Sequence, residues 1–174
     1  SDSVVFHQSL SLTALPLIDE RYDTVLIDGD HNWYTVFHEL LCIEKAAERN
    51  GFFPLVVLHD IGWPYGRRDM YTDPTQIPEQ YCQPFARMGL SPSSSALVKE
   101  GGLNAHVLNA MSEHSSRNGV LTAVEDFLSQ SSLPLDFITL PGFFGIGLMI
   151  DRRMLERSPT LLAFMKSLRL PNML

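Results

Sequence analysis

Two stretches of this chain carry an apolar run straight into carboxylates and imidazoles. One is TVLIDGDHNW at residues 24–33, and the other is FFPLVVLHD at residues 52–60. Carboxylates bind hard divalent cations, and imidazoles bind metal ions and exchange protons near neutral pH. The polar residues that end the two runs are Asp28, Asp30, His31, His59 and Asp60.

The apolar runs predict the strands that must position these groups. Residues 25–27 and 55–58 are apolar on consecutive positions, which is typical of strands covered on both faces in parallel sheets. Ligands of open α/β sheets bind outside the carboxyl ends of the strands. We therefore expect Asp28 and Asp60 to lie close enough to share one ion, because hard cations hold oxygen ligands at roughly 2.0–2.6 Å.

Ordinary structural roles compete with these interpretations. Apolar residues recur at helical spacing from Trp33 onward, and Asp30 or Asn32 could cap the start of that helix. The pair Asn50-Gly51 predicts its end. His38 fits an ordinary helix residue.

The rest of the chain continues the alternation of strands and helices. Segment 61–118 is long and irregular, which predicts a lid or insertion within one domain spanning residues 1–174. The aromatic residues of this segment either line a substrate pocket or form a small core of their own. The other predicted elements are a strand at 4–10, a short helix at 12–18, a helix at 119–130, two strands around a turn at Pro141-Gly142, and a helix at 152–168 interrupted at Pro159.

The composition limits the partners of the chain. Its 174 residues carry a formal net charge of -7, which disfavours binding to a phosphate backbone. No apolar run reaches the roughly 18 residues of a membrane span. The two cysteines, Cys42 and Cys82, form no zinc motif and no disulfide framework, which favours a reducing, cytoplasmic location. We expect a small-molecule substrate, no nucleic acid and no membrane, and a homo-oligomer is left open.

Together these stretches resemble a known family. YDTVLIDGDHNWYTVFHELL followed by LVVLHD is similar to class I S-adenosylmethionine-dependent methyltransferases, in the group whose fourth strand ends in D-G-D-H and whose fifth ends in H-D. Residues 119–151 resemble the end of such domains, where a helix precedes antiparallel sixth and seventh strands. VVFHQSLSLTALP is similar to the third strand and the polar turn after it. The resemblance implies a Rossmann-like open α/β sheet, mostly parallel, with an antiparallel C-terminal edge strand.

The resemblance also implies a cofactor site. Gln8 and Ser9 would lie at the adenine end of S-adenosylmethionine, and Asp28 and Gly29 near its methionine end. The glycine-rich loop after the family's first strand has no counterpart, because the G-x-G at residues 145–147 opens no helix. We therefore expect a domain truncated at its N-terminus, which lacks half of the cofactor site and alone binds S-adenosylmethionine weakly or not at all.

The chemistry implied is methyl transfer to a hydroxyl group. The positions that match the metal site of metal-dependent relatives are Asp28, His59 and Asp60, and Mg²⁺ is one candidate ion. A histidine at the first position of the H-D pair departs from the acidic or amide residue common there. Alternatively, His31 or His59 acts as the general base that removes the proton of the substrate hydroxyl. The protein then mainly positions the acceptor for in-line displacement.

Two other functions compete with an O-methyltransferase acting on a small hydroxylated substrate. One is a degenerate methyltransferase-like module with a binding or structural role. The other is a metal-dependent glycosyltransferase, suggested by D-x-D at Asp28 and Asp30, or a phosphoesterase.

Truncation would also expose an edge of the strand at residues 24–27. We expect residues 4–6 to pair beside it, or else a second copy of the chain to cover it.

Overall fold

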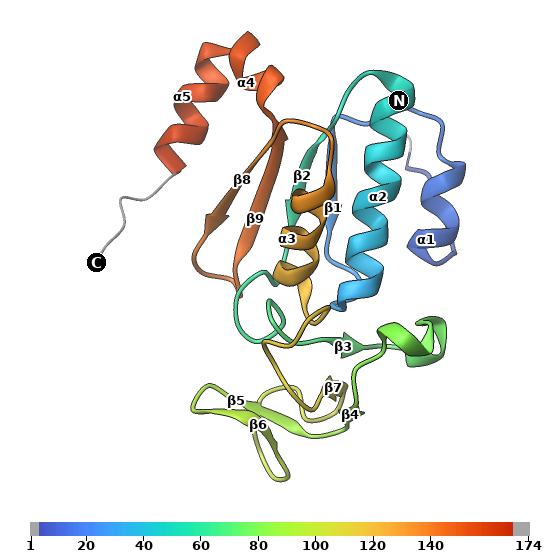
Figure 1. The fold of residues 1–174 in the computed structure, drawn as a ribbon, viewed down its shortest axis with the longest axis vertical. Helices are drawn as coiled ribbons and strands as arrows, with labels where there is room; N and C mark the ends of the chain where they lie inside the picture. The colour runs from blue at the N-terminus through green and yellow to red at the C-terminus, as the bar shows by residue number, and fades with distance from the viewer. Residues whose placement is uncertain (1–3, 169–174) are drawn as a thin grey trace.

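The central sheet is mixed. The computed structural model describes residues 4–168, and its main sheet has the strand order β1 (Thr24–Ile27), β2 (Leu55–Leu58), β9 (Ile146–Asp151), β8 (Leu135–Leu140) (Figure 1). β1 and β2 are parallel, whereas β9 is antiparallel to both of its neighbours. The prediction of a mixed α/β fold is confirmed. The sheet is not mostly parallel, and the antiparallel strand β9 lies inside it, because β9 pairs with β2 and leaves β8 at the edge.

Two helices cover one face of this sheet. In α2 (Trp33–Asn50), the Asn32 side chain accepts a 2.8 Å hydrogen bond from the Thr35 amide, and Gly51 ends the helix at φ 67°. α3 (Val120–Gln130) packs beside α2 (Figure 1). The apolar stripes of both helices meet Val56, Leu58 and Met149 of the sheet in one core. Both helices were predicted, and of the two suggested caps Asn32 is the one used.

The opposite face is only partly covered. Asp151 caps α4 (Arg152–Arg157), and α5 (Pro159–Leu168) restarts after Ser158, as Pro159 predicts. The two helices pack against β8 and β9 in a second core that includes Ile138 and Ile150. They do not extend over β1, where Leu26 is 66% exposed. The prediction that both faces of this strand are buried is therefore wrong for β1.

The N-terminal segment does not form the predicted strand. Residues 4–10 contain no regular element, and they lead into α1 (Ser11–Ala14) and the 3₁₀ turn η1 (Leu15–Leu17), which contact α2. Residues 4–6 are more than two-thirds exposed, so no burial offsets the entropy of ordering a strand there. Within residues 4–168, β1 has no strand on its outer edge. Pairing of residues 4–6 beside β1 is thus a wrong prediction, and coverage by a second copy stays a prediction.

Segment 61–118 lies beyond the carboxyl ends of β1 and β2 (Figure 1). It forms a small sheet of order β3-β7-β4, a hairpin β5–β6, and two 3₁₀ turns. The guanidinium of Arg68 is buried inside the segment, where it donates to the carbonyls of Ala110 and Ser95. The bounds are β3 (Met70–Tyr71), η2 (Pro74–Gln76), η3 (Glu79–Tyr81), β4 (Phe85–Ala86), β5 (Gly89–Ser91), β6 (Ser94–Val98) and β7 (Leu108–Ala110).

Asp69 ties this segment to the starts of both core helices. Its carboxylate is fully buried and accepts hydrogen bonds from the amides of Trp33 (2.7 Å) and Gly119 (2.6 Å) and from the Tyr71 hydroxyl (2.8 Å). Burial raises the pKa of Asp69 to about 6, although these three donors act to lower it.

Across the described residues, no helix combines the length and the hydropathy needed to cross a membrane.

Candidate metal centre

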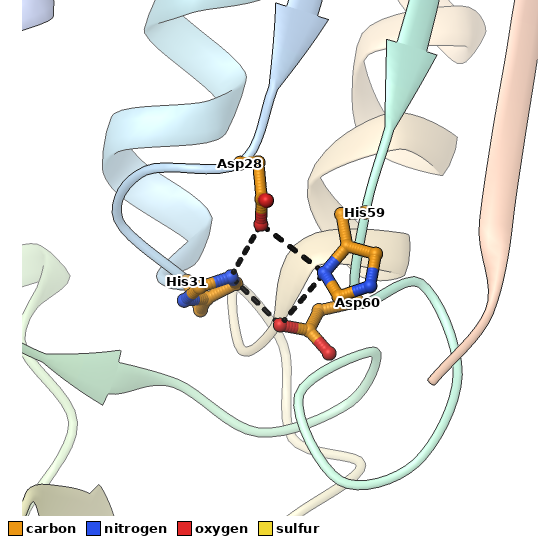
Figure 2. A group of neighbouring side chains, drawn as sticks. All are labelled: Asp28, His31, His59 and Asp60. Atoms are coloured by element: carbon orange, nitrogen blue, oxygen red, sulfur yellow. Dashed lines mark ion pairs between the residues drawn. The ribbon is translucent and has the colours of Figure 1, made fainter. Parts of the chain in front are cut away.

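Four side chains converge at the carboxyl ends of β1 and β2. Figure 2 shows carboxylates and imidazoles alternating around a closed ring. His31 Nε2 lies 2.7 Å from Asp60 Oδ2 and 3.5 Å from Asp28 Oδ1, while His59 Nδ1 lies 3.1 Å from Asp28 Oδ1 and 3.4 Å from Asp60 Oδ2. The four atoms all lie within 4.8 Å of one another. The expectation that Asp28 and Asp60 approach closely is met, and both histidines join them.

The contacts within this cluster are not ordinary hydrogen bonds. Among the described residues, His31 Nε2 and His59 Nδ1 are buried and make no hydrogen bond of regular geometry, and their close contacts are ion pairs with the carboxylate oxygens. Buried polar nitrogens normally make regular hydrogen bonds, so two imidazole nitrogens and two carboxylate oxygens that share one small space without them require an explanation. Four donors about 2.0–2.1 Å from a tetrahedral ion lie about 3.3 Å apart. The four sides of the ring, at 2.7, 3.1, 3.4 and 3.5 Å, are close to that spacing, whereas its diagonals are longer than a regular tetrahedron requires and reach up to 4.8 Å.

The fold fixes each member of the cluster. Asp28 directly follows β1, and the His59 amide donates to the Ile27 carbonyl (3.1 Å), which prolongs the pairing of β1 and β2 to the site. Asp60 takes a left-handed backbone at φ 57°. The backbone of His31 is anchored where its carbonyl accepts from the Met70 amide (2.9 Å). Segment 61–118 therefore helps to position a residue that precedes it.

Ring stacking adds to the placement of His31. The centroids of the His31 and Tyr65 rings lie 5.6 Å apart with the planes nearly parallel. Burial disfavours the imidazolium form of His31, but the carboxylates of Asp60 and Asp28 outweigh it, so the pKa of His31 is raised above its ordinary value. A metal ion would compete with this proton, because a ligating imidazole must be neutral.

The donor set narrows the class of ion. Two imidazole nitrogens and two carboxylate oxygens form a mixed site, whereas Mg²⁺ prefers an octahedral shell of oxygens and retained waters. Imidazole suits Zn²⁺ and Fe²⁺, and carboxylate suits Mn²⁺. The cluster thus fits a borderline transition-metal ion better than Mg²⁺, which stays a prediction from the family resemblance.

The predicted cofactor residues are divided between two neighbouring hollows. Ser9 and Gly29 line one of about 440 Å³, and Asp28 and Gly29 line another of about 520 Å³. Glu39 borders both. Gln8 is exposed and lines neither hollow. The structure therefore brings three of the four predicted residues to a connected region beside the metal cluster.

Other predicted residues have local roles. Asp30 Oδ2 accepts hydrogen bonds from the Asn32 amide group (3.0 Å) and the Thr35 hydroxyl (3.3 Å), so Asp30 supports the start of α2. His38 Nδ1 contacts the Tyr34 carbonyl at 2.7 Å. Tyr65 and Tyr71 are buried, in accord with a small core of the segment's own.

The sequence did not point to two residues beside the site. Glu39 is a buried acid whose Oε2 has no hydrogen-bond partner among the described residues. The spacing of apolar residues in α2 does not indicate that this acid is buried. Phe144 places its ring 6.4 Å from that of His59, at an interplanar angle of 88°. The run FFG between two strands indicates a turn. That this turn lies close in space to the D-G-D-H motif could not be predicted, because it depends on the order of the strands in the sheet.

Comparison with known proteins gave no relative. No family model, curated protein or solved structure matched the chain.

Proposed function

We propose that the cluster of Asp28, His31, His59 and Asp60 binds one divalent transition-metal ion, and that the chain is part of an S-adenosylmethionine-dependent O-methyltransferase acting on a small hydroxylated substrate. The single observation that carries the metal site is the convergence of four donor atoms within 4.8 Å of one another. The methyltransferase assignment rests on the D-G-D-H and H-D motifs and on their placement at adjacent strand ends.

The fold is compatible with this family without identifying it. α3 precedes the antiparallel pair β8–β9, which is the order that the resemblance implies for the end of such a domain. The hollows lined by Ser9, Asp28 and Gly29 offer space for a cofactor next to the cluster. The Rossmann-like fold and the cytoplasmic location remain part of this proposal, and the two free cysteines accord with that location.

In this function, the ion would be held by the four side chains and would lower the pKa of a bound acceptor hydroxyl. The chain itself would orient the acceptor, and the proton of the acceptor hydroxyl would pass to water. Figure 2 shows that the second ring nitrogen of His59 faces away from the cluster, and the side chain is 29% exposed. A neutral imidazole that ligates an ion through Nδ1 carries its proton on the other ring nitrogen, so this outer nitrogen of His59 would donate a hydrogen bond to the acceptor and could act as a base only without the ion.

Of the alternatives, the site gives less support to the glycosyltransferase alone. A D-x-D motif would need Asp30 beside Asp28, but Asp30 is engaged with Asn32 and Thr35. A metal phosphoesterase shares the donor set and differs by its substrate. A binding module without activity would retain the metal and lack turnover.

Methyl transfer from S-[methyl-¹⁴C]adenosylmethionine to a panel of small hydroxylated acceptors tests the proposal. The assay uses a protein that also supplies the part of the cofactor site that the resemblance places outside this chain, and there we expect Mn²⁺-dependent or Zn²⁺-dependent labelling that is lost in His31→Ala. The matched control is His106→Ala, because the His106 side chain is exposed and outside the cluster.

Three other outcomes would redirect the assignment. Labelling that survives chelation and His31→Ala would contradict the role of the ion. Metal binding without labelling of any acceptor would favour the inactive module. Hydrolysis of a phosphoester or a sugar nucleotide in parallel assays would favour a metal-dependent phosphoesterase or glycosyltransferase.

A further inference from the structure

His31 lacks the contact that normally orients a ligating imidazole. Figure 2 shows that one of its ring nitrogens, Nε2, faces the carboxylates and that the other points away from the cluster. This other nitrogen, Nδ1, is buried and has no hydrogen-bond partner among residues 4–168. A histidine that holds a metal ion almost always donates from its second ring nitrogen, and that hydrogen bond fixes the ring. A different interaction must therefore set the orientation of the His31 ring.

The ring of Tyr65 is placed to supply that interaction. It stacks on the imidazole of His31 with the ring centroids 5.6 Å apart and the planes inclined by 28°, which is within the range of favourable aromatic pairs. Among the described residues, it is the only ring that contacts His31. A stacked neighbour restricts tilting of the imidazole plane, so Nε2 stays directed at the space between the two carboxylates.

Tyr65 is itself held in place at both ends. The residue is 3% exposed, and its carbonyl accepts from the Val120 amide at 2.9 Å, where α3 begins. Its hydroxyl accepts from the Asn104 side-chain amide at 2.8 Å and donates to Asn109 Oδ1 at 3.2 Å. The Asn109 side-chain amide in turn donates to the carbonyls of Met88 and Asn104. The ring that meets His31 is therefore anchored deep in segment 61–118.

We infer that Tyr65 is a positioning residue of the metal centre, whose ring takes the place of the missing hydrogen bond and holds the His31 imidazole for the ion. This inference rests on the proposed function, and within it on the metal site alone. The hydrogen bond from the Met70 amide to the His31 carbonyl fixes the backbone, and Tyr65 fixes the ring.

Calorimetric titration with Zn²⁺ tests the inference through two substitutions at this position. Tyr65→Leu removes the stacked ring and should weaken Zn²⁺ binding by about 10- to 100-fold, the loss usual for a residue that orients a ligand. Tyr65→Phe keeps the ring in its buried place, so it should bind Zn²⁺ as tightly as wild type. It should do so even though Asn104 and Asn109 each lose a hydrogen bond.

Tyr81→Leu is the matched control for loss of a packed aromatic ring. The Tyr81 ring stacks on Trp33 with the centroids 5.7 Å apart and the planes inclined by 22°, and Trp33 lies two residues from His31 but outside the cluster. Urea unfolding of all variants separates stability from affinity. Tyr81→Leu should keep the Zn²⁺ affinity of wild type.

Nitrogen-15 NMR of the Zn²⁺-loaded proteins gives a readout that a change in stability alone would not move. In wild type and Tyr65→Phe we expect one sharp set of His31 ring signals with Nε2 as the ligating nitrogen. In Tyr65→Leu the His31 signals should broaden or split, whereas those of His59 stay sharp.

Three results would overturn the inference and leave the metal centre standing. They are equal Zn²⁺ affinity in wild type and Tyr65→Leu, equal losses in Tyr65→Leu and either Tyr65→Phe or Tyr81→Leu, and broadened His31 signals in wild type, which needs no variant to fold. Failure of wild type to bind Zn²⁺ would overturn the proposed function, and this inference with it.

Discussion

Asp60 is the carboxylate on which the cluster depends most. One oxygen of each carboxylate contacts both imidazoles, but the Asp60 side chain is 9% exposed, against 49% for Asp28, and makes the shortest contact, 2.7 Å to His31 Nε2. We expect Asp60→Asn to weaken Zn²⁺ binding at least about 100-fold, since loss of even a supporting residue costs 10- to 100-fold. Asparagine tolerates the left-handed backbone at this position, so the fold should persist.

Calorimetric titration with Zn²⁺ measures this effect directly. Asp19→Asn supplies the control, because Asp19 is exposed and outside the cluster. An Asp60→Asn variant that binds Zn²⁺ as tightly as wild type would show that the ion is held elsewhere.

Glu39 makes the stability of the fold depend on pH. Burial raises its pKa to about 7 from the ordinary 4.5, although the Ser11 hydroxyl acts to lower it. Below about pH 4.5 the Glu39 carboxyl is neutral in both the folded and the unfolded chain. Between about 4.5 and 7 the unfolded chain loses its proton first, so the free energy of unfolding falls as pH rises, by roughly 3 kcal/mol in all.

Glu39→Gln should remove this component. Urea unfolding midpoints between pH 4.5 and 7.5 should decline less in Glu39→Gln than in wild type, and the variant should be the more stable of the two at pH 7.5. Parallel declines in the two proteins would mean that Glu39 does not carry its proton into the folded state.

The residues of the cluster could be predicted because they follow strands directly. The proximity of Asp28, His59 and Asp60 follows once the two apolar runs are paired as parallel strands. His31 is close as well because it lies three residues from Asp28. Phe144 and Glu39 could not be identified in this way. The position of Phe144 depends on where β9 inserts in the sheet, and that of Glu39 on which side of α2 faces a hollow rather than the core.

At the scale of the elements, Asp69 joins the starts of α2 and α3 to segment 61–118. Asp69→Ala would leave the amides of Trp33 and Gly119 buried without their acceptor. We expect a loss of about 2–4 kcal/mol in the free energy of unfolding, because each unsatisfied buried donor costs about 1–3 kcal/mol and release of the buried acid offsets part of it.

Asp73→Ala is the comparison for this loss, since Asp73 is exposed and caps only the short turn η2. Guanidinium unfolding should separate the two variants clearly. A midpoint for Asp69→Ala as high as that for Asp73→Ala would contradict the role of Asp69 in joining these elements.

Elements with a clear period or clear end signals were predictable. α2 begins beside Asn32 and ends at Gly51, and α5 restarts at Pro159, where the sequence indicates. The strands of segment 61–118 have two to five residues, too few to show a period of two. The apolar residues 4–6 led to the prediction of a strand at 4–10, but no other part of the described fold packs against them.

At the scale of the molecule, β1 is an open edge beside the site. Within residues 4–168 its strand partner is β2 alone, whereas β2 and β9 each have two neighbours. Edge strands leave part of their amides free. We expect the amides of β1 to exchange with deuterium faster than those of β2, as measured by NMR at a protein concentration low enough to avoid association.

Dilution serves as the control for this measurement. Protection in β1 that equals that in β2 and disappears on dilution would show that a second copy covers the edge. Equal protection that is independent of concentration would contradict the strand order described for residues 4–168.

X-ray absorption at the zinc K-edge tests most directly whether two imidazoles and two carboxylates hold one ion. The chain is loaded with one equivalent of Zn²⁺ and compared with His106→Ala treated in the same way. We predict nitrogen and oxygen scatterers at about 2.0–2.1 Å, with outer-shell scattering from two imidazole rings. A first shell containing sulfur at about 2.3 Å, or a first shell without imidazole scattering, would contradict the metal centre of Asp28, His31, His59 and Asp60.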